Sequence, residues 1–258
     1  MGATVGVVTS LGSGPSAPDP WPQGAWDQAE VILSPPAPLD EVAQRSQLIL
    51  LSLPDGELRQ ALSSLGGFIG RKKVIVSTCP VVPLRLMRSL IGDGPALFRA
   101  VIPWGTHAGE GVAALAADPG TAPEAVRVVE DALAWIGAVE VMSEETLDAV
   151  TALGLGGAAF LCAAVQGLEE GAVREGLPRA TARSLAHQTA LATALLLRDH
   201  PGSPADLKDQ VTSPGGTTVA ALSILEDTAV RGAFLRAVQR SAGGVRARRY
   251  AASPGVIE

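Results

Sequence analysis

Residues 206–218, DLKDQVTSPGGTT, join two segments of helical pattern through a turn of unusual composition. The proline of this turn fixes φ and has no backbone N–H, whereas Gly215 and Gly216 adopt backbone angles that other residues avoid. Thr217 and Thr218 place two hydroxyl groups in the first turn of the next helix, where unpaired N–H groups and the helix dipole suit a small carboxylate. On these residues alone, the turn is either an anion site or an N-cap loop between two core helices.

The sequence around this turn is helical in pattern from Glu144 to its end. Helices are expected at residues 147–176, 180–200, 217–225 and 230–248. Ser203 is a good N-cap and Pro204 suits a first helical position, so a further helix is expected to begin there. Long apolar helices with many small residues need burial on most of their faces, and a domain of this size provides little of it. We therefore expect a partner subunit.

The first part of the sequence alternates short apolar segments with segments of helical pattern. Strands are expected at residues 4–9, 29–33, 47–53, 73–77, 96–102 and 139–142, and helices at residues 39–45, 57–69, 83–90 and 121–136. This alternation is typical of a parallel α/β sheet, and it stops near Ser143. The predicted fold class is a truncated Rossmann-like parallel α/β sheet over residues 1–142, followed by an all-α dimerisation domain over residues 143–258.

Composition and charge exclude several classes of function. The 258 residues are 47% hydrophobic and carry a net charge of −6, so no basic surface for nucleic acid is expected. Cys79 and Cys162 are too few for a disulfide framework, and the histidines share no metal-ligand spacing. No secretory signal is visible, and the most apolar run, at residues 153–165, is shorter than a membrane span. We predict a soluble cytoplasmic protein without a metal ion.

A glycine-rich segment follows the first expected strand. Gly12, Ser13 and Gly14, with Ala17 behind them, have the spacing G-x-G-x-x-A of a dinucleotide-binding turn. Four prolines between residues 15 and 22 are incompatible with a regular helix after that turn, which also begins late after the strand. The segment is therefore either a degenerate phosphate-binding turn or a proline-rich surface loop.

Residues 200–226, HPGSPADLKDQVTSPGGTTVAALSILE, resemble the signature of the pyrroline-5-carboxylate reductases. The resemblance continues in ETLDAVTAL at residues 145–153 and in EEGAVREGLPRATARSLAHQTALATALLL at residues 169–197. It is dense over residues 143–249 and looser over residues 47–115. The motif is highly specific, so the chain is identified as a member of this family.

This resemblance implies an NAD(P)H-dependent oxidoreductase of proline biosynthesis. In that family, a reduced nicotinamide cofactor delivers hydride to the C=N bond of 1-pyrroline-5-carboxylate, and interlocked helical domains form a homodimer or a higher oligomer. The substrate carboxylate is expected on the glycine-rich turn, with Thr218 as the catalytic residue near the imine nitrogen. The implied substrate-binding residues are Ser213, Gly215, Gly216, Thr217 and Thr218.

The chain departs from the family pattern on the cofactor side. The family's Lys-Pro after the central strand is Leu53-Pro54 here, and Trp104 replaces an asparagine that helps to hold nicotinamide and substrate. The first helix, the second strand and the next helix of the family are expected to be collapsed into residues 11–28. The predicted cofactor-binding residues, for NADP or NAD, are Gly12, Ser13, Gly14, Leu53, Pro54 and Trp104.

Two hypotheses follow from these departures. The first is a reductase that acts on a proline precursor or another cyclic imine through a degenerate but usable cofactor site. The second is a non-catalytic relative that has lost cofactor binding and acts as a carboxylate-binding or regulatory dimer. Titration of NADPH and NADH separates them, since only the first needs a cofactor.

Overall fold

The computed structural model describes residues 4–9, 30–34, 38–67, 69–70, 72–103 and 111–252. The chain divides into two compact units, which are Met1–Leu155 with Arg240–Glu258, and Gly156–Gln239. We call the first the sheet unit and the second the helical unit. The predicted domains, residues 1–142 and 143–258, stay a prediction, since the sheet unit takes residues from two separate parts of the chain.

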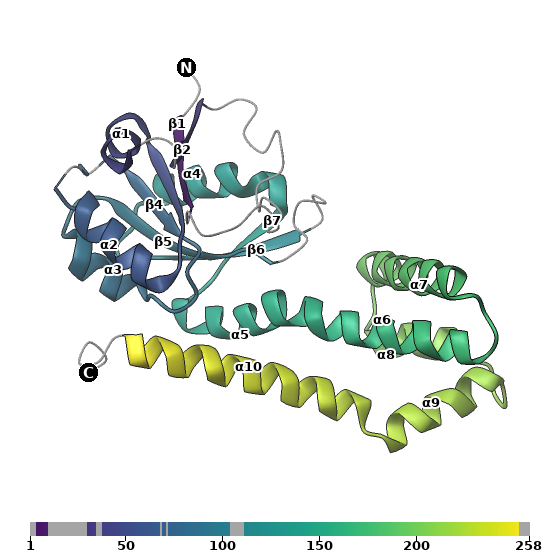
Figure 1. The fold of residues 1–258 in the computed structure, drawn as a ribbon. Helices are drawn as coiled ribbons and strands as arrows, with labels where there is room; N and C mark the ends of the chain where they lie inside the picture. Colours follow the sequence, from purple (N-terminus) through teal and green to yellow (C-terminus); the bar gives the residue numbers. More distant parts are fainter. Residues whose placement is uncertain are drawn as a thin grey trace. The chain divides into compact units, whose positions relative to one another are not determined.

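The described part of the sheet unit contains a seven-stranded sheet in the order β2-β1-β3-β4-β5-β6-β7. Figure 1 shows this sheet with helices packed around it. The strands are β1 (Thr4–Thr9), β2 (Glu30–Ser34), β3 (Leu48–Ser52), β4 (Val74–Ser77), β5 (Ala96–Val101), β6 (Gly111–Ala117) and β7 (Gly137–Val141). All neighbouring strands are parallel except β5 and β6, which are antiparallel. β3 and β4 are continuous apolar runs, as strands buried on both faces require.

Helices cover both faces of this sheet. The helices are α1 (Leu39–Arg45), α2 (Asp55–Leu65), α3 (Leu84–Ile91), α4 (Pro123–Leu133) and α5 (Leu147–Thr151). Ile49 and Leu51 point to the face that packs against α1, α2 and α3, whereas Leu48 and Leu50 point to the face that packs against α4. This alternation follows from the period of two in a strand, and it gives the sheet unit two apolar cores.

The antiparallel pair of β5 and β6 differs from the expected parallel sheet. β6 is also a strand that the sequence pattern did not predict. Only residues 102–110 connect β5 to β6. A parallel crossover needs about a dozen residues or more. A connection as short as this one therefore returns the chain in the opposite direction. The predicted fold class, a Rossmann-like α/β sheet followed by helices, is otherwise confirmed.

The expectation that the second strand and the next helix are collapsed into residues 11–28 is wrong. β2 pairs with β1 in parallel, and α1 follows it before β3 begins. α1 lies so close to β1 that a Cβ atom on Gly6 would lie 2.4 Å from Val42 Cγ1 and 2.5 Å from Ser46 Oγ. The edge of the sheet beside β1 is therefore present as in other doubly wound folds.

The described residues of the helical unit form helices joined by short loops, without a strand. The helices are α6 (Gly157–Arg174), α7 (Arg179–Asp199), α8 (Pro204–Gln210), α9 (Thr217–Asp227) and α10 (Val230–Ala252), and the last part of α10 belongs to the sheet unit. A π-helical turn, Ala152–Gly156, precedes α6. The predicted helices are confirmed, with ends that differ by a few residues. Among the residues of this unit, only Glu169, Ala182 and Ala186 are buried.

Within the described ranges, one helical segment is long and apolar enough to cross a membrane by length and composition alone. It covers Glu144–Arg174 and contains an 18-residue window of mean hydropathy 1.7, of which 17% is buried. A helix whose apolar face is covered in an oligomer has the same composition, and a single such helix is weak evidence for a membrane. The predicted cytoplasmic location stays a prediction.

Candidate functional site

The strand order reverses at β1, which has β2 on one side and β3 on the other. In open α/β sheets, ligands bind beyond the carboxyl ends of the strands at such a reversal. Leu53 and Pro54 follow the carboxyl end of β3, so these two predicted cofactor-binding residues lie at this edge. Leu53 is buried, and Pro54 is the N-cap of α2. The other predicted cofactor-binding residues, Gly12, Ser13, Gly14 and Trp104, lie outside the described residues.

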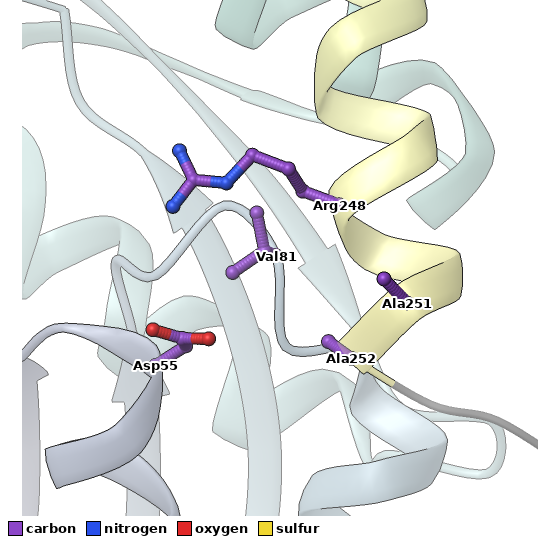
Figure 2. A pocket seen from close by; sticks show the side chains of 5 residues that line it. All are labelled: Asp55, Val81, Arg248, Ala251 and Ala252. Atoms are coloured by element: carbon purple, nitrogen blue, oxygen red, sulfur yellow. The ribbon is translucent and has the colours of Figure 1, made fainter.

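A pocket of about 230 Å³ opens at the same edge (Figure 2). Asp55, the first residue of α2, and Val81, in the loop after β4, form one side of it, and Arg248, Ala251 and Ala252 of α10 form the other. Sequence reasoning missed this pocket. Asp55 could have been found, because it directly follows the predicted Leu53-Pro54 in the sequence. Arg248 could not, because no local sequence pattern places it beside Asp55.

Two contacts hold the last turns of α10 in the sheet unit. Arg59 of α2 donates a hydrogen bond to the carbonyl oxygen of Ala252. Arg249 Nη2 lies 3.1 Å from Asp148 Oδ2, and the two side chains are 16% and 1% exposed. The end of α10 is thereby tied to α2 at one point and to α5 at another.

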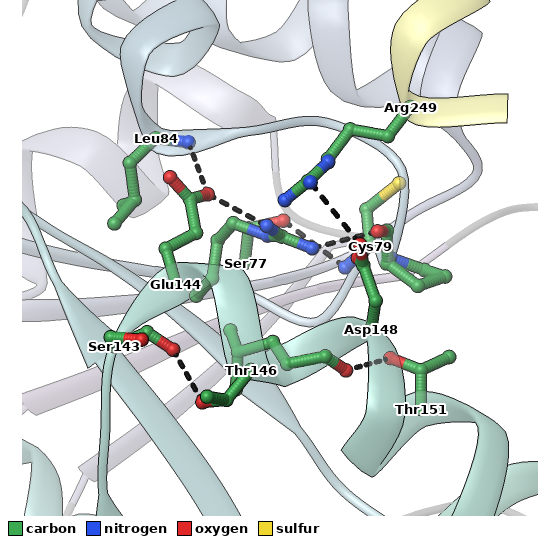
Figure 3. A network of polar contacts seen from close by, with 12 residues as sticks. Ser77, Cys79, Leu84, Ser143, Glu144, Thr146, Asp148, Thr151 and Arg249 are labelled. Atoms are coloured by element: carbon green, nitrogen blue, oxygen red, sulfur yellow. Dashed lines mark hydrogen bonds and ion pairs between the residues drawn. The ribbon is translucent and has the colours of Figure 1, made fainter. Parts of the chain in front are cut away.

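A buried arginine holds the loop that carries Val81. Arg99 of β5 is 1% exposed; it donates from Nη1 to Glu144 Oε1 at 2.6 Å and from Nη2 to the carbonyl oxygen of Pro80 at 2.7 Å. The Leu84 N–H donates to the same Glu144 oxygen at 2.8 Å (Figure 3). This network joins β5, the loop after β4 and the segment after β7, so the pocket wall that contains Val81 is fixed from behind.

Asp148, whose charge interacts with those of Arg249 and Arg99, is the least well paired charge beside this network. Neither of its carboxylate oxygens accepts a hydrogen bond from the described residues, because the contact with Arg249 is close but lacks hydrogen-bond geometry. Burial raises the pKa of Asp148, and the positive charges of Arg249, Arg99 and Arg246 offset only part of this effect. Asp148 is therefore an ionisable group that the folded chain holds closer to protonation than solvent does.

Cys79 lies in the same loop as Val81, but it is not an activated thiol. Burial raises the pKa of this thiol, and this effect exceeds the opposing hydrogen bonds from the backbone of Val81 and Val82. A thiol with a raised pKa is a poor nucleophile. In the described part of the chain, no group of three His, Cys, Asp or Glu side chains is placed to hold a metal ion.

The second predicted site lies in the helical unit, between α8 and α9. α8 begins with a capping box, in which Asp206 N donates to Ser203 Oγ at 3.3 Å and Ser203 N donates to Asp206 Oδ2 at 2.6 Å. α9 begins after Gly216 without a side-chain cap. The first N–H groups of α9 are thus free of the side-chain acceptor that α8 has.

The structure brings all five predicted substrate-binding residues together at the start of α9. Gly215 has a φ of 71°, and Gly216 N donates to the carbonyl oxygen of Ser213 at 2.9 Å, so the turn is closed by its own backbone. Ser213, Thr217 and Thr218 are exposed. The turn can therefore receive a small anion, and the roles of its residues stay a prediction.

Comparison with known proteins gives a consistent family. The family described as pyrroline-5-carboxylate reductase dimerisation matches residues 144–247. A pyrroline-5-carboxylate reductase of Synechocystis sp. is 35% identical over 199 residues, which cover 77% of this chain and 74% of that protein. One of Methanosarcina acetivorans is 30% identical over 200 residues, which cover 78% of this chain and 74% of that protein.

Solved structures share the fold at lower identity. The pyrroline carboxylate reductase of Plasmodium falciparum, solved with NADP bound, has a TM-score of 0.83 at 18% identity and covers 96% of this chain and 98% of its own. The 1-pyrroline-5-carboxylate reductase of Streptococcus pyogenes has a TM-score of 0.81 at 22% identity and covers 95% of this chain and 99% of its own. At these identities, the likeness concerns the fold alone.

Proposed function

Because the chain belongs to the pyrroline-5-carboxylate reductase family, we propose that it reduces the C=N bond of a cyclic imino acid, 1-pyrroline-5-carboxylate or a close relative, to the amine. The observation that carries this proposal is the start of α9, where an exposed turn leaves the first N–H groups without a side-chain cap. A substrate that combines a carboxylate with an imine matches this turn, since the N–H groups bind the carboxylate and a hydroxyl group lies beside them.

Four residues of the turn have a role in this proposal. The N–H groups of Thr217 and Thr218 bind the carboxylate, and Gly215 and Gly216 let the backbone approach it closely. The Thr218 hydroxyl group orients the imine nitrogen. A protonated imine accepts hydride without a strong acid or base, so the chain's contribution is mainly binding and orientation.

The carboxyl edge of the sheet fits a nicotinamide dinucleotide, which supplies the hydride when bound. The strand order reverses there between β2, β1 and β3, and α2 begins at this edge with Pro54, which offers no side-chain cap to the first N–H groups. The proposal includes both NADPH and NADH, and the dissociation constants of the two decide which one the chain prefers.

We also propose that the helical unit forms a homodimer. Leu161, Leu191 and Leu196 are between 53% and 65% exposed, although they lie on long helices. A pocket of about 350 Å³, which Leu161, Cys162 and His187 help to line, opens between α6 and α7 on the same unit. A second copy of the chain covers these apolar surfaces, in agreement with the dimerisation family that matches this region.

The activity is tested by measuring proline formation from 1-pyrroline-5-carboxylate with NADPH and with NADH. We expect turnover by the wild type, a fall in kcat of about 10²-fold in Thr218→Ala, and no change in the matched control Ser223→Ala on the same helix. Absence of turnover, together with absence of NADPH and NADH binding at millimolar concentration, overturns the function. Turnover by the wild type with an unaffected Thr218→Ala variant overturns the site.

A further inference from the structure

The pocket beside α10 lies on one particular side of the strand reversal. In doubly wound folds, the pyrophosphate of a dinucleotide lies near the turn after the first strand, and the adenosine ribose lies near the end of the second. The other half of the dinucleotide therefore extends over the strands on the far side of β1, which are β3 and β4 here. Asp55 and Val81 follow these two strands, so the pocket lies on the nicotinamide side of the edge.

Two opposite charges line this pocket without pairing. Among the described residues, neither Arg248 nor Asp55 forms a side-chain hydrogen bond or an ion pair, although both contribute to the same 230 Å³. In Figure 2, the Arg248 side chain extends from α10 across the loop of Val81, and the carboxylate of Asp55 lies on the α2 side. The N–H donors of Arg248 and the carboxylate acceptors of Asp55 are therefore both available to a ligand.

This pair of charges selects one ligand chemistry. A guanidinium group is a planar multiple donor that suits phosphate, whereas a carboxylate accepts hydrogen bonds from the hydroxyl groups of ribose. A simple anion pairs with Arg248 only and leaves Asp55 unpaired, and a metal cation pairs with Asp55 only and leaves Arg248 unpaired. A ribose phosphate presents hydroxyl groups and a phosphate within one small unit, and the remaining lining by Val81, Ala251 and Ala252 is apolar and compact.

The walls of the pocket are held by contacts outside it. Arg59 binds the carbonyl oxygen of Ala252, and Asp148 lies 3.1 Å from Arg249, next to Arg248 in the chain. On the opposite side, Arg99 binds the carbonyl oxygen of Pro80, next to Val81. The backbone of these walls therefore loses little conformational freedom when a ligand binds, and the cost of ordering falls mainly on the exposed Arg248 side chain.

We propose that Arg248 and Asp55 bind the nicotinamide ribose and its phosphate, so that α10 supplies a cofactor contact from outside the loops of the sheet. Arg248 donates to the phosphate oxygens, and Asp55 accepts from the ribose hydroxyl groups. This inference rests on the proposed function, because it takes the dinucleotide as the ligand of the edge. Arg248 is then a cofactor-binding residue that lies more than a hundred residues after the sheet in the sequence.

The proposal is tested by calorimetric titration of NADPH and of NADH into the wild type and three variants. We expect Arg248→Gln to raise Kd by about 10- to 100-fold, and Arg248→Lys, which keeps the charge but not the planar donor, to raise it less. Arg240→Gln removes the same charge from an exposed position two turns earlier on α10 and serves as the control. The Kd of the control stays within twofold of the wild type.

Salt dependence gives a second readout that does not need activity. Binding through Arg248 makes Kd rise with NaCl concentration, and the rise becomes shallower in Arg248→Gln but not in Arg240→Gln. Wild-type binding with an unchanged Kd in Arg248→Gln overturns this inference and leaves the proposed function intact. An equal effect of Arg248→Gln and Arg240→Gln also overturns it, because the contact is then only long-range. No wild-type binding of either dinucleotide removes the proposed function itself.

Discussion

Ile49, Leu50 and Ile75 of the sheet unit are fully buried, whereas Leu161, Leu191 and Leu196 of the helical unit are more than half exposed. The two units contain similar apolar residues, but these residues are buried in the sheet unit and exposed in the helical unit. Each face of the sheet packs against helices of the same unit. In the helical unit, α6 packs against α7, but most apolar side chains of both helices stay exposed, so we expect this surface to be covered in an oligomer.

The polar groups of the two units differ in the same way. In the sheet unit, Arg99 and Asp148 are withdrawn from solvent. In the helical unit, Arg183 and Arg231 make ion pairs while more than half exposed. Buried charges depend strongly on their partners, whereas exposed ion pairs contribute little. Mutations of charged residues are therefore expected to matter more in the sheet unit, and mutations of apolar residues to act through assembly in the helical unit.

The largest effect is expected from charges placed on the apolar face of α7. Replacing both Leu191 and Leu195 by Glu buries carboxylates in the proposed homodimer, at a cost of several kcal/mol for each. We expect the dimer to dissociate into monomers at micromolar concentration, measured by analytical ultracentrifugation. The matched pair of Leu→Met changes keeps the surface apolar and the dimer intact. A wild type that is monomeric, or a glutamate variant that stays dimeric, contradicts the proposal that the exposed apolar surface of the helical unit is a dimer interface.

The next effect concerns the buried arginine of the sheet unit. Arg99→Ala leaves Glu144 without its guanidinium partner and opens a cavity on the α2 side of the sheet, so we expect a loss of about 3–5 kcal/mol. Urea unfolding followed by circular dichroism measures it. Arg127→Ala, which removes an ion pair whose side chains are 65% and 75% exposed, is expected to change stability by less than about 1 kcal/mol. Similar losses of unfolding free energy in Arg99→Ala and Arg127→Ala contradict the prediction that the buried arginine matters more.

A smaller effect tests whether local contacts support the helical unit. Ser203→Ala removes the capping box of α8, which is exposed and gains little from packing, and the expected loss is about 1 kcal/mol. Ser213→Ala is the matched control, because α9 has no side-chain cap. The thermal unfolding of the two variants is compared at one protein concentration, since dimerisation makes Tm depend on concentration. Equal Tm values show that the cap is not used.

The smallest effect depends on pH. The pKa of Asp148 is raised in the folded chain, so its ionised form favours unfolding and its protonated form does not. Asp148→Asn should match the wild type near pH 4 and become relatively more stable as pH rises through the raised pKa, by no more than a few degrees in Tm. Thermal unfolding of both proteins from pH 4 to pH 8 measures this difference. A variant that loses stability most at high pH reverses the sign and contradicts the prediction.

Much of the fold was predictable from local pattern. LILLS at β3 and LDEVAQR at α1 have the composition and period of their elements, and both lie where they were expected. β6, with the sequence GVAALAA, was not predicted, because alanine-rich segments carry no strand signal and only pairing with β5 makes it a strand. Antiparallel pairing follows from the length of the connection rather than from the residues themselves.

The two candidate sites differ in how far the sequence leads to them. The residues at the start of α9 are consecutive, so the sequence motif already places them together, and the structure adds only their exposure and the absence of a side-chain cap. Arg248 and Asp55 are brought together by the packing of α10 in the sheet unit, which no local pattern encodes. Of the predicted cofactor-binding residues, only Leu53 and Pro54 lie within the described structure, and their roles stay predictions.

The hydrogen bond from Arg59 to Ala252 joins residues 193 positions apart. A ribosome that adds about 5–20 residues per second makes the strands several seconds before the last turns of α10, and makes the whole helical unit in between. During this interval the newly made sheet lacks the wall of the pocket that α10 forms. If Arg248 binds the dinucleotide, a chain at this stage lacks one of its cofactor contacts. Tight binding then begins only after α10 packs against the sheet unit.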